Sequence, residues 1–424
     1  MKSLKEKIKL IEFRNGLNQI IVYKELFYYL FLFFHLIIIF RALLVSSMIE
    51  LLGIVELIYI TILVLYVFYL IIKKSLSPRF TLNPFEILIV CIAVLPFWSA
   101  IAARIEWGQP IIFGIVAIKQ VYLIFGSLLL FNLLKNNKIT LLMVERVFVG
   151  VAWFNLIYFS LMTAFTDPAV YKTSVLAASQ LAKGGTVYYR FSMAFISFGA
   201  IYYFIKSLNE KRSLIFIYFL FFLVYIVFIR LDRTSILVTV FSILTYYILY
   251  SNPKKHFINI FRFVLPLCLA LLLIFIIDPD LIANYTRMFD DVYYTLIGEE
   301  KPGSQSVTRI YEFNIAKKYV DKNLWVGNGI ISNSWLEYGF NSMFIFFYPS
   351  DLGVFGQVFI YGLPGTIIIY SQYLFALYFI LRIGYKLKST FYLSLVFYLF
   401  SLFLDSLSNG FLTVYAAQTH RQLH

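Results

Sequence analysis

Two arginines three residues apart are the residues of this sequence best suited to bind an anion. Arg230 and Arg233, with Asp232 between them, interrupt a long apolar stretch. Two guanidinium groups close together can clamp a phosphate or a pyrophosphate, because their planar forks match the geometry of its oxygens. The same pattern fits a tight turn whose arginines reach lipid phosphates while Asp232 pairs with one of them. The segment therefore predicts either an anion-binding turn or a snorkelling turn at a membrane edge.

Arg190, Arg309 and Asp351 are further candidates for the same chemistry. Arg190 opens an apolar run after a glycine-containing segment, and Arg309 lies near the start of an expected helix. Asp351, where another apolar run begins, can cap a helix, act as a general base toward a sugar hydroxyl, or orient an arginine. Glu312, three residues after Arg309, is expected to pair with it along the helix rather than to catalyse.

Several familiar signatures are absent from the sequence. It has no glycine-rich phosphate loop followed by Lys-Ser or Lys-Thr, and no HExxH motif, so ATP-driven transport within this chain is not expected. The four histidines are scattered and both cysteines sit in apolar runs, so neither a metal centre nor a disulfide framework is expected. The sequence therefore predicts no cofactor and no metal.

The composition requires lipid to act as the solvent for most of the chain. Of 424 residues, 61% are hydrophobic and only 14% are charged, with a mean hydropathy of +0.82. Apolar stretches of roughly 17 to 25 residues recur, which is the length of a helix that crosses a bilayer. The sequence predicts an all-α, polytopic transmembrane helical bundle in which residues 1–424 form a single integral membrane domain. About eleven spans are expected, at residues 26–44, 51–72, 85–103, 111–134, 141–165, 191–205, 214–229, 231–249, 261–277, 352–381 and 391–414.

Lysine and arginine are unevenly distributed over the segments between these spans. The amino-terminal segment and every second segment after it hold most of them, and short cytoplasmic loops retain positive charge. The amino terminus is therefore predicted to be cytoplasmic, and the arginine candidates to face outward. The net charge of +14 follows largely from this topology, so nucleic-acid binding is not expected.

Segment 278–350 is the one long polar stretch, and it is predicted to be a large extracytoplasmic loop containing short helices. Residues 306–320 suit an amphipathic helix lying on the membrane. Along this helix four residues lie about one turn apart, namely Val307, Ile310, Tyr311 and Asn314. A glycine turn at 325–329 and an aromatic-rich stretch follow, and rings at that density suit the lipid interface or stack on sugars.

Several short motifs follow one another along the chain between residues 190 and 365. They are Arg190-Phe-Ser, the Arg230-Leu-Asp-Arg-Thr-Ser turn, Thr308-Arg-Ile-Tyr-Glu312, Leu324-Trp-Val-Gly-Asn-Gly329, and Ser350-Asp-Leu-Gly-Val-Phe-Gly followed by Tyr-Gly-Leu-Pro-Gly365. In their order and spacing they resemble the O-antigen polymerase (Wzy-type) and O-antigen ligase superfamily of polytopic membrane glycosyltransferases. The resemblance covers residues 185–365 well and the remainder only by topology.

Members of that superfamily join glycans carried on undecaprenyl pyrophosphate at the outer face of the cytoplasmic (inner) membrane, without a metal or a nucleotide. The resemblance implies that an acceptor hydroxyl attacks the anomeric carbon of the donor and that lipid pyrophosphate leaves. Arg190 and either Arg230 or Arg233 would bind this leaving group, and Arg309 would help to stabilise its growing charge. Asp351 would be the base or would orient an arginine. A chain-length regulator and a flippase are the implied protein partners.

Two alternatives to a polymerase remain open at this point. Ligases of the superfamily carry a histidine in the large outer loop, and segment 278–350 has none, which favours a polymerase. A flippase that transports lipid-linked oligosaccharide is expected to show two similar halves with central charged residues, and no internal repeat is visible. The leading hypothesis is therefore a polymerase of surface polysaccharide, whether O-antigen, capsule or exopolysaccharide.

Overall fold

The computed structural model describes most of the chain as helices. The described residues are 25–40, 49–76, 81–165, 179–181, 187–189, 194–210, 212–230, 233–250, 286, 290, 293–294, 305–336, 339–344, 347–387 and 389–408. Apart from one pair of three-residue antiparallel strands, the elements of this part are helical, which confirms the all-α class. For Arg230 and Arg233 only the backbone is described.

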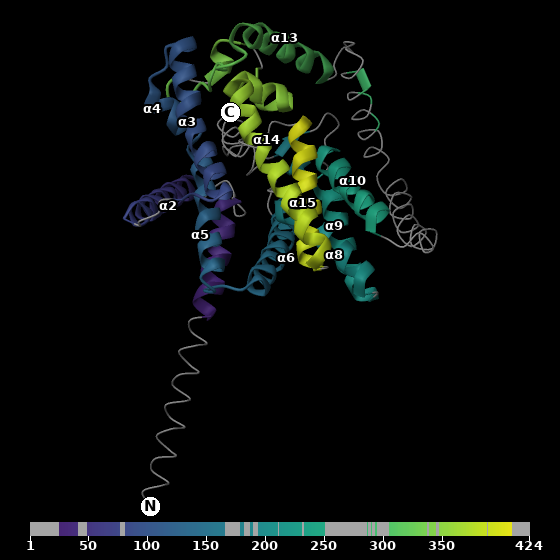
Figure 1. Cartoon of the computed structure of the whole chain (residues 1–424). Helices are drawn as coiled ribbons and strands as arrows, with labels where there is room; N and C mark the ends of the chain where they lie inside the picture. Colours follow the sequence, from purple (N-terminus) through teal and green to yellow (C-terminus); the bar gives the residue numbers. More distant parts are fainter. Residues whose placement is uncertain are drawn as a thin grey trace, which may run out of the picture.

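The first helix is Glu25–Ile39, and the later elements keep the labels of Figure 1. They are α2 (Ile49–Ser75), α3 (Pro84–Trp107), α4 (Ile111–Ala117), η2 (Lys119–Ile124), α5 (Phe125–Lys135), α6 (Leu141–Phe165), β1 (Ser179–Leu181), β2 (Val187–Tyr189), α8 (Ala194–Glu210), α9 (Ser213–Val224), η3 (Tyr225–Arg230), α10 (Arg233–Tyr250), α13 (Gln305–Asn323), η5 (Gly339–Ser342), η6 (Pro349–Leu352), α14 (Gly353–Leu387) and α15 (Thr390–Ser408).

Five helices of the described part are long and apolar enough to cross a membrane. They are Gly53–Ser75, Pro84–Trp107, Leu141–Phe165, Pro349–Tyr378 and Thr390–Leu407. A sixth candidate is the pair formed by α4 and the helix Lys119–Lys135, which are bent by 55° at a short break. Each predicted span overlaps a helix except 261–277, which lies outside the described residues. The total of eleven spans, the outward loop and the cytoplasmic amino terminus stay predictions.

The helix α8 lies at the centre of one group of helices. Every residue from 195 to 205 is buried, because α6, α9, α10 and α15 all pack against α8 (Figure 1). Aromatic rings fill this interior: Phe148 of α6 makes edge-to-face contacts with Phe195 and Phe198 at centroid distances of 5.5 and 5.4 Å. Such pairs stabilise a helix interface by their geometry as well as by burial.

A second group of helices, built on α3, carries the candidate site. Asn83 caps α3: its side chain accepts the Glu86 N–H at 2.8 Å, and the Glu86 carboxylate accepts the Asn83 N–H at 3.0 Å. Pro84 at the first helical position and Gly108 with φ of 76° at the end complete the boundary signals of α3, as their backbone preferences predict. The helix α14 packs against α3, α13 and α15, and so joins the two groups.

The helix α13 lies across one end of the molecule, near the start of α14 (Figure 1). The predicted helix at 306–320 is present, and its placement on the membrane stays a prediction. Tyr311 and Asn314 are exposed, whereas Glu312, Ala316 and Val320 are buried. The reason is that α13 packs on α14 and η6, so protein contacts decide which face is covered.

Gly126 of α5 lies against the first helix. A Cβ atom on Gly126 would lie 2.5 Å from Ile39 Cδ1 and 2.8 Å from His35 Cε1. The His35 side chain is buried, and its Nδ1 is hydrogen bonded to the Tyr59 hydroxyl of α2. This bond limits how far the imidazole can move away from an added methyl group.

Replacing Gly126 by alanine is expected to destabilise this packing. Overpacking of this kind costs about 1–3 kcal/mol, which should appear as a lower melting temperature of the detergent-solubilised protein. Gly53→Ala on α2 is the matched control, because its Cβ would meet nothing within 4 Å and alanine is the better helix former. Equal stability of the two variants would contradict the contact between the first helix and α5.

Candidate functional site

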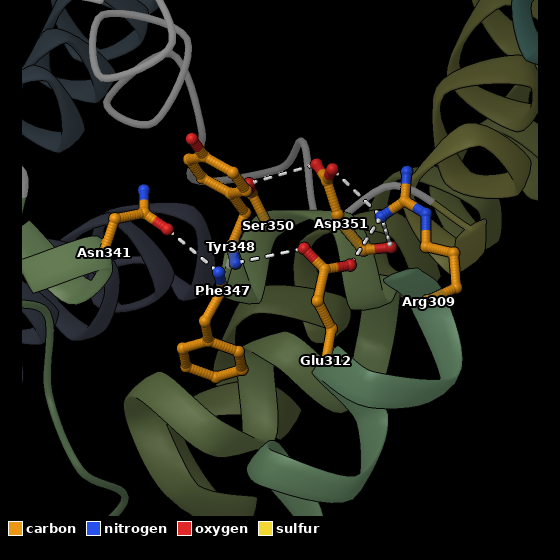
Figure 2. A network of polar contacts seen from close by, with 7 residues as sticks. All are labelled: Arg309, Glu312, Asn341, Phe347, Tyr348, Ser350 and Asp351. Atoms are coloured by element: carbon orange, nitrogen blue, oxygen red, sulfur yellow. Dashed lines mark hydrogen bonds and ion pairs between the residues drawn. The ribbon is translucent and has the colours of Figure 1, made fainter. Parts of the chain in front are cut away.

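An ion pair between α13 and η6 is the centre of the candidate site (Figure 2). Arg309 Nη1 lies 3.0 Å from Asp351 Oδ2 and also donates to the Asp351 carbonyl oxygen at 2.7 Å. The two residues are 42 positions apart in the sequence. The structure therefore brings together two of the predicted site residues, and the contact to both oxygen types fixes the guanidinium relative to the start of α14.

Glu312 is a third member of this site and is the most deeply buried of the three. Its side chain is 1% exposed, compared with 25% for Arg309 and 14% for Asp351. Glu312 Oε2 lies 3.4 Å from Arg309 Nη1, so the predicted i,i+3 pair is present. Its other oxygen accepts the backbone N–H of Tyr348 at 3.2 Å, a contact that the sequence gives no means to foresee.

The turn that carries Asp351 is held by its backbone. The Asp351 N–H donates to the Tyr348 carbonyl at 2.9 Å, and the Phe347 N–H donates to Asn341 Oδ1 at 2.9 Å (Figure 2). Pro349 begins η6, where its fixed φ and missing N–H cost nothing. These contacts leave the Asp351 carboxylate little freedom to move away from Arg309.

Aromatic residues beneath the turn form a packed core. Phe347 is fully buried and lies against Phe340 and Phe359, at centroid distances of 5.5 and 5.2 Å. Trp107 of α3 also packs edge-to-face against Phe340. The sequence predicts that these rings meet lipid or sugar, which is wrong for Phe340 and Phe347, although Trp325 remains 65% exposed.

The structure gives Asp351 a cation partner at the start of α14. The Asp351 carboxylate is paired with Arg309, and its Oδ1 accepts a hydrogen bond from the Ser350 hydroxyl at 3.4 Å. Its position is suited to orienting Arg309 or to accepting a proton. The alternative that Asp351 caps the following helix stays a prediction.

Burial affects the charge of Arg309 only slightly. Desolvation of the guanidinium lowers the pKa of Arg309, and the neighbouring carboxylate of Glu312 opposes that shift. Because arginine keeps its proton throughout the physiological range, the group stays positive. Its contacts with the two carboxylates all involve Nη1, and Figure 2 shows the other terminal nitrogen pointing away from both.

The helix that follows the candidate site, α14, contains a break. At Gly362 the backbone leaves the helical region, with φ of 68° and ψ of −179°. The segment that follows α13 pairs with this break: Leu363 N–H donates to the Leu324 carbonyl at 2.8 Å, and Gly329 N–H donates to the Ile360 carbonyl at 3.0 Å. These bonds occupy backbone groups in an apolar helix, where an unpaired group would be costly.

The same segment is held on its other side by α3. The indole N–H of Trp98 donates to the Val326 carbonyl at 2.9 Å, and that of Trp107 donates to the Asn328 carbonyl at 2.7 Å. Lys322 at the end of α13 pairs with Glu106 of α3 at 2.8 Å. The carboxyl end of α13 is therefore fixed between α3 and α14, which sets the direction in which α13 presents Arg309.

Comparisons with known proteins do not identify a relative of this chain. No family model matches the sequence, and no curated protein matches it significantly. The resemblance described above therefore stays a hypothesis. Among the residues that the structure describes, no group of three or more His, Cys, Asp or Glu side chains is placed to hold a metal ion.

The three other predicted arginines are located only in part. Arg230 is the last residue of the π-helix η3, and Arg233 is the first residue of α10. Their side chains, and all of Arg190, lie outside the described residues. The strand β2 ends at Tyr189, directly before Arg190. Their joint action with Arg309 on one ligand stays a prediction.

Proposed function

We propose that this protein is a metal-independent polysaccharide polymerase that joins undecaprenyl-pyrophosphate-linked oligosaccharide repeat units at the outer face of the cytoplasmic membrane. The observation that carries the proposal is the ion pair of Arg309 with Asp351, held by Glu312 at the junction of α13 and a broken apolar helix. A charged group fixed at the end of a membrane span is costly without a use. The family resemblance supplies the substrate class.

In the proposed reaction, an acceptor sugar hydroxyl attacks the anomeric carbon of the donor repeat unit. The new glycosidic C–O bond forms while the bond to the pyrophosphate oxygen breaks, and the hydroxyl proton passes to the Asp351 carboxylate. Arg190, Arg230 and Arg233 bind the pyrophosphate and stabilise its charge. This assignment places segment 278–350 outside the membrane and the amino terminus inside, in a bundle of about eleven spans.

A transporter of the same lipid-linked oligosaccharide is the second candidate. Broken helices are common at the substrate sites of transporters, and this structure has a break at Gly362 in α14 and a bend of 55° between α4 and the helix after it. A transporter makes no bond, so the two candidates differ in their products. An O-antigen ligase would transfer finished chains instead of extending them.

The test compares surface polysaccharide on gels from a deletion strain complemented with wild type, Arg309→Ala, Asp351→Ala or Arg233→Ala. A polymerase predicts a ladder for wild type and single repeat units for the deletion strain and for each variant that reaches the membrane at normal levels. Asp321→Ala, at an exposed acid on the same helix as Arg309, is the matched control and should keep the ladder. Lipid-linked units that accumulate on the inner leaflet would favour the transporter.

A further inference from the structure

The positive charge of Arg309 is already shared between two carboxylates. Its Nη1 lies 3.0 Å from Asp351 Oδ2 and 3.4 Å from Glu312 Oε2. Both acids are held in place, Glu312 by the Tyr348 N–H and Asp351 by the turn of η6. A pyrophosphate bound by Arg309 would lie close to these two negative charges, and like charges repel strongly in partly buried surroundings.

The exposed part of the cluster is better suited to accept hydrogen bonds than to donate them. The Asp351 side chain is 14% exposed to solvent, and an ionised carboxylate accepts hydrogen bonds at both oxygens. A sugar hydroxyl is a neutral donor of that kind, so it gains a charge-assisted hydrogen bond without repulsion. The hydroxyl of Ser350, 3.4 Å from Asp351 Oδ1, already makes a contact of this type.

We infer that the Arg309–Asp351 pair receives a hydroxyl of the acceptor glycan and does not bind the pyrophosphate. Asp351 is then the catalytic residue that contacts the sugar, while Arg309 and Glu312 are positioning residues that hold its carboxylate. The pyrophosphate is bound elsewhere, by Arg230 and Arg233, as in the proposed function. This division of roles rests on the proposed polymerase function. It differs from what the resemblance implies, because Arg309 no longer stabilises the charge of the leaving pyrophosphate.

The test measures binding of two separate probes to the purified protein in lipid nanodiscs. One probe is undecaprenyl pyrophosphate without sugar, and the other is the oligosaccharide released by mild acid from lipid-linked units of the deletion strain. Asp351→Asn should weaken oligosaccharide binding roughly tenfold or more, the effect of losing a hydrogen bond to a charged group, and leave lipid pyrophosphate binding unchanged. Arg233→Gln should do the reverse.

Variants of Arg309 and Glu312 test whether these residues position Asp351 or whether Arg309 binds the pyrophosphate. Arg309→Gln should weaken oligosaccharide binding and spare lipid pyrophosphate. Glu312→Gln keeps an acceptor for the Tyr348 N–H, so it should bind the oligosaccharide better than Glu312→Ala does. Arg309→Lys keeps the charge and serves as the milder variant if Arg309→Gln does not fold, and Asp321→Asn should change neither probe.

The outcomes separate this inference from the proposed function. Weaker lipid pyrophosphate binding by Arg309→Gln or Arg309→Lys, with normal oligosaccharide binding, would overturn the inference and leave the polymerase intact. Wild-type protein that binds lipid pyrophosphate but no oligosaccharide would also overturn it. Wild-type protein that binds neither probe would overturn the proposed function together with the inference.

Discussion

Replacement of Gly329 by alanine is expected to prevent stable folding of the protein. A Cβ atom on Gly329 would lie 2.2 Å from the Ser99 carbonyl oxygen and 2.4 Å from the Ala103 nitrogen, both backbone atoms of α3. The φ of Gly329 is +70°, which costs a residue with a Cβ atom about 1–2 kcal/mol in addition. A helix backbone cannot give way as a flexible side chain does. The measurement is the yield of monodisperse protein in detergent and its melting temperature.

Gly150→Ala is the matched control for this result. Gly150 lies within α6, and a Cβ atom there would meet nothing within 4 Å. Alanine at an open helical position stabilises by about 0.4–1 kcal/mol, chiefly because the unfolded chain loses freedom. If Gly329→Ala folds and melts like Gly150→Ala, the segment after α13 does not lie against α3 as described.

The sequence predicts the glycine turn at 325–329 but not where this turn lies in the fold. Glycine spacing indicates a tight turn wherever it occurs, so the turn could be recognised from composition. Its insertion between α3 and the break in α14 depends on backbone pairs such as Gly329 N–H with the Ile360 carbonyl. Every residue type has a backbone carbonyl that accepts hydrogen bonds, and every type except proline has a backbone N–H that donates. Such backbone pairs therefore leave no signal in the sequence.

Hydropathy likewise predicts the apolar segments but not the points at which they break. The sequence treats 111–134 and 352–381 as continuous spans, whereas the structure bends the first by 55° and interrupts the second at Gly362. Gly362 and Pro364 were available as local signals, since both residues disfavour a regular helix. Hydropathy averaged over a window of about 19 residues changes little when two such residues stand among many apolar ones.

For the candidate site, the sequence predicts a set of residues but not their geometry. Charge and position single out Arg309 and Asp351, because a charged group at the end of an apolar span is costly unless it is paired or has a function. Their pairing across 42 residues is a tertiary contact that spacing does not reveal. The sequence does not predict the burial of Glu312 for a related reason, since a glutamate on an amphipathic helix normally faces water.

Arg309→Met is the second substitution for which we expect a large effect, here on stability. The variant removes the cation between Glu312, which is 1% exposed, and Asp351, which is 14% exposed. Removing one partner from a buried ion pair costs about 3 kcal/mol, because a carboxylate is then desolvated without that counter-ion. The expected result is a clear fall in the melting temperature of the purified protein, larger than the loss of side-chain packing explains.

A second substitution and a matched control identify the cause of that fall. Adding Glu312→Gln to Arg309→Met removes the buried charge and keeps an acceptor for the Tyr348 N–H, so it should recover part of the lost stability. Lys322→Met breaks the ion pair between α13 and Glu106 of α3. The Lys322 side chain is 64% exposed, and exposed pairs contribute about 0–1 kcal/mol. If Arg309→Met costs no more than Lys322→Met, or if the double variant is less stable still, Glu312 does not depend on Arg309 for its charge. The carboxylate that holds the Asp351 turn would then be stabilised by other contacts, and Arg309 would be free to act on a ligand.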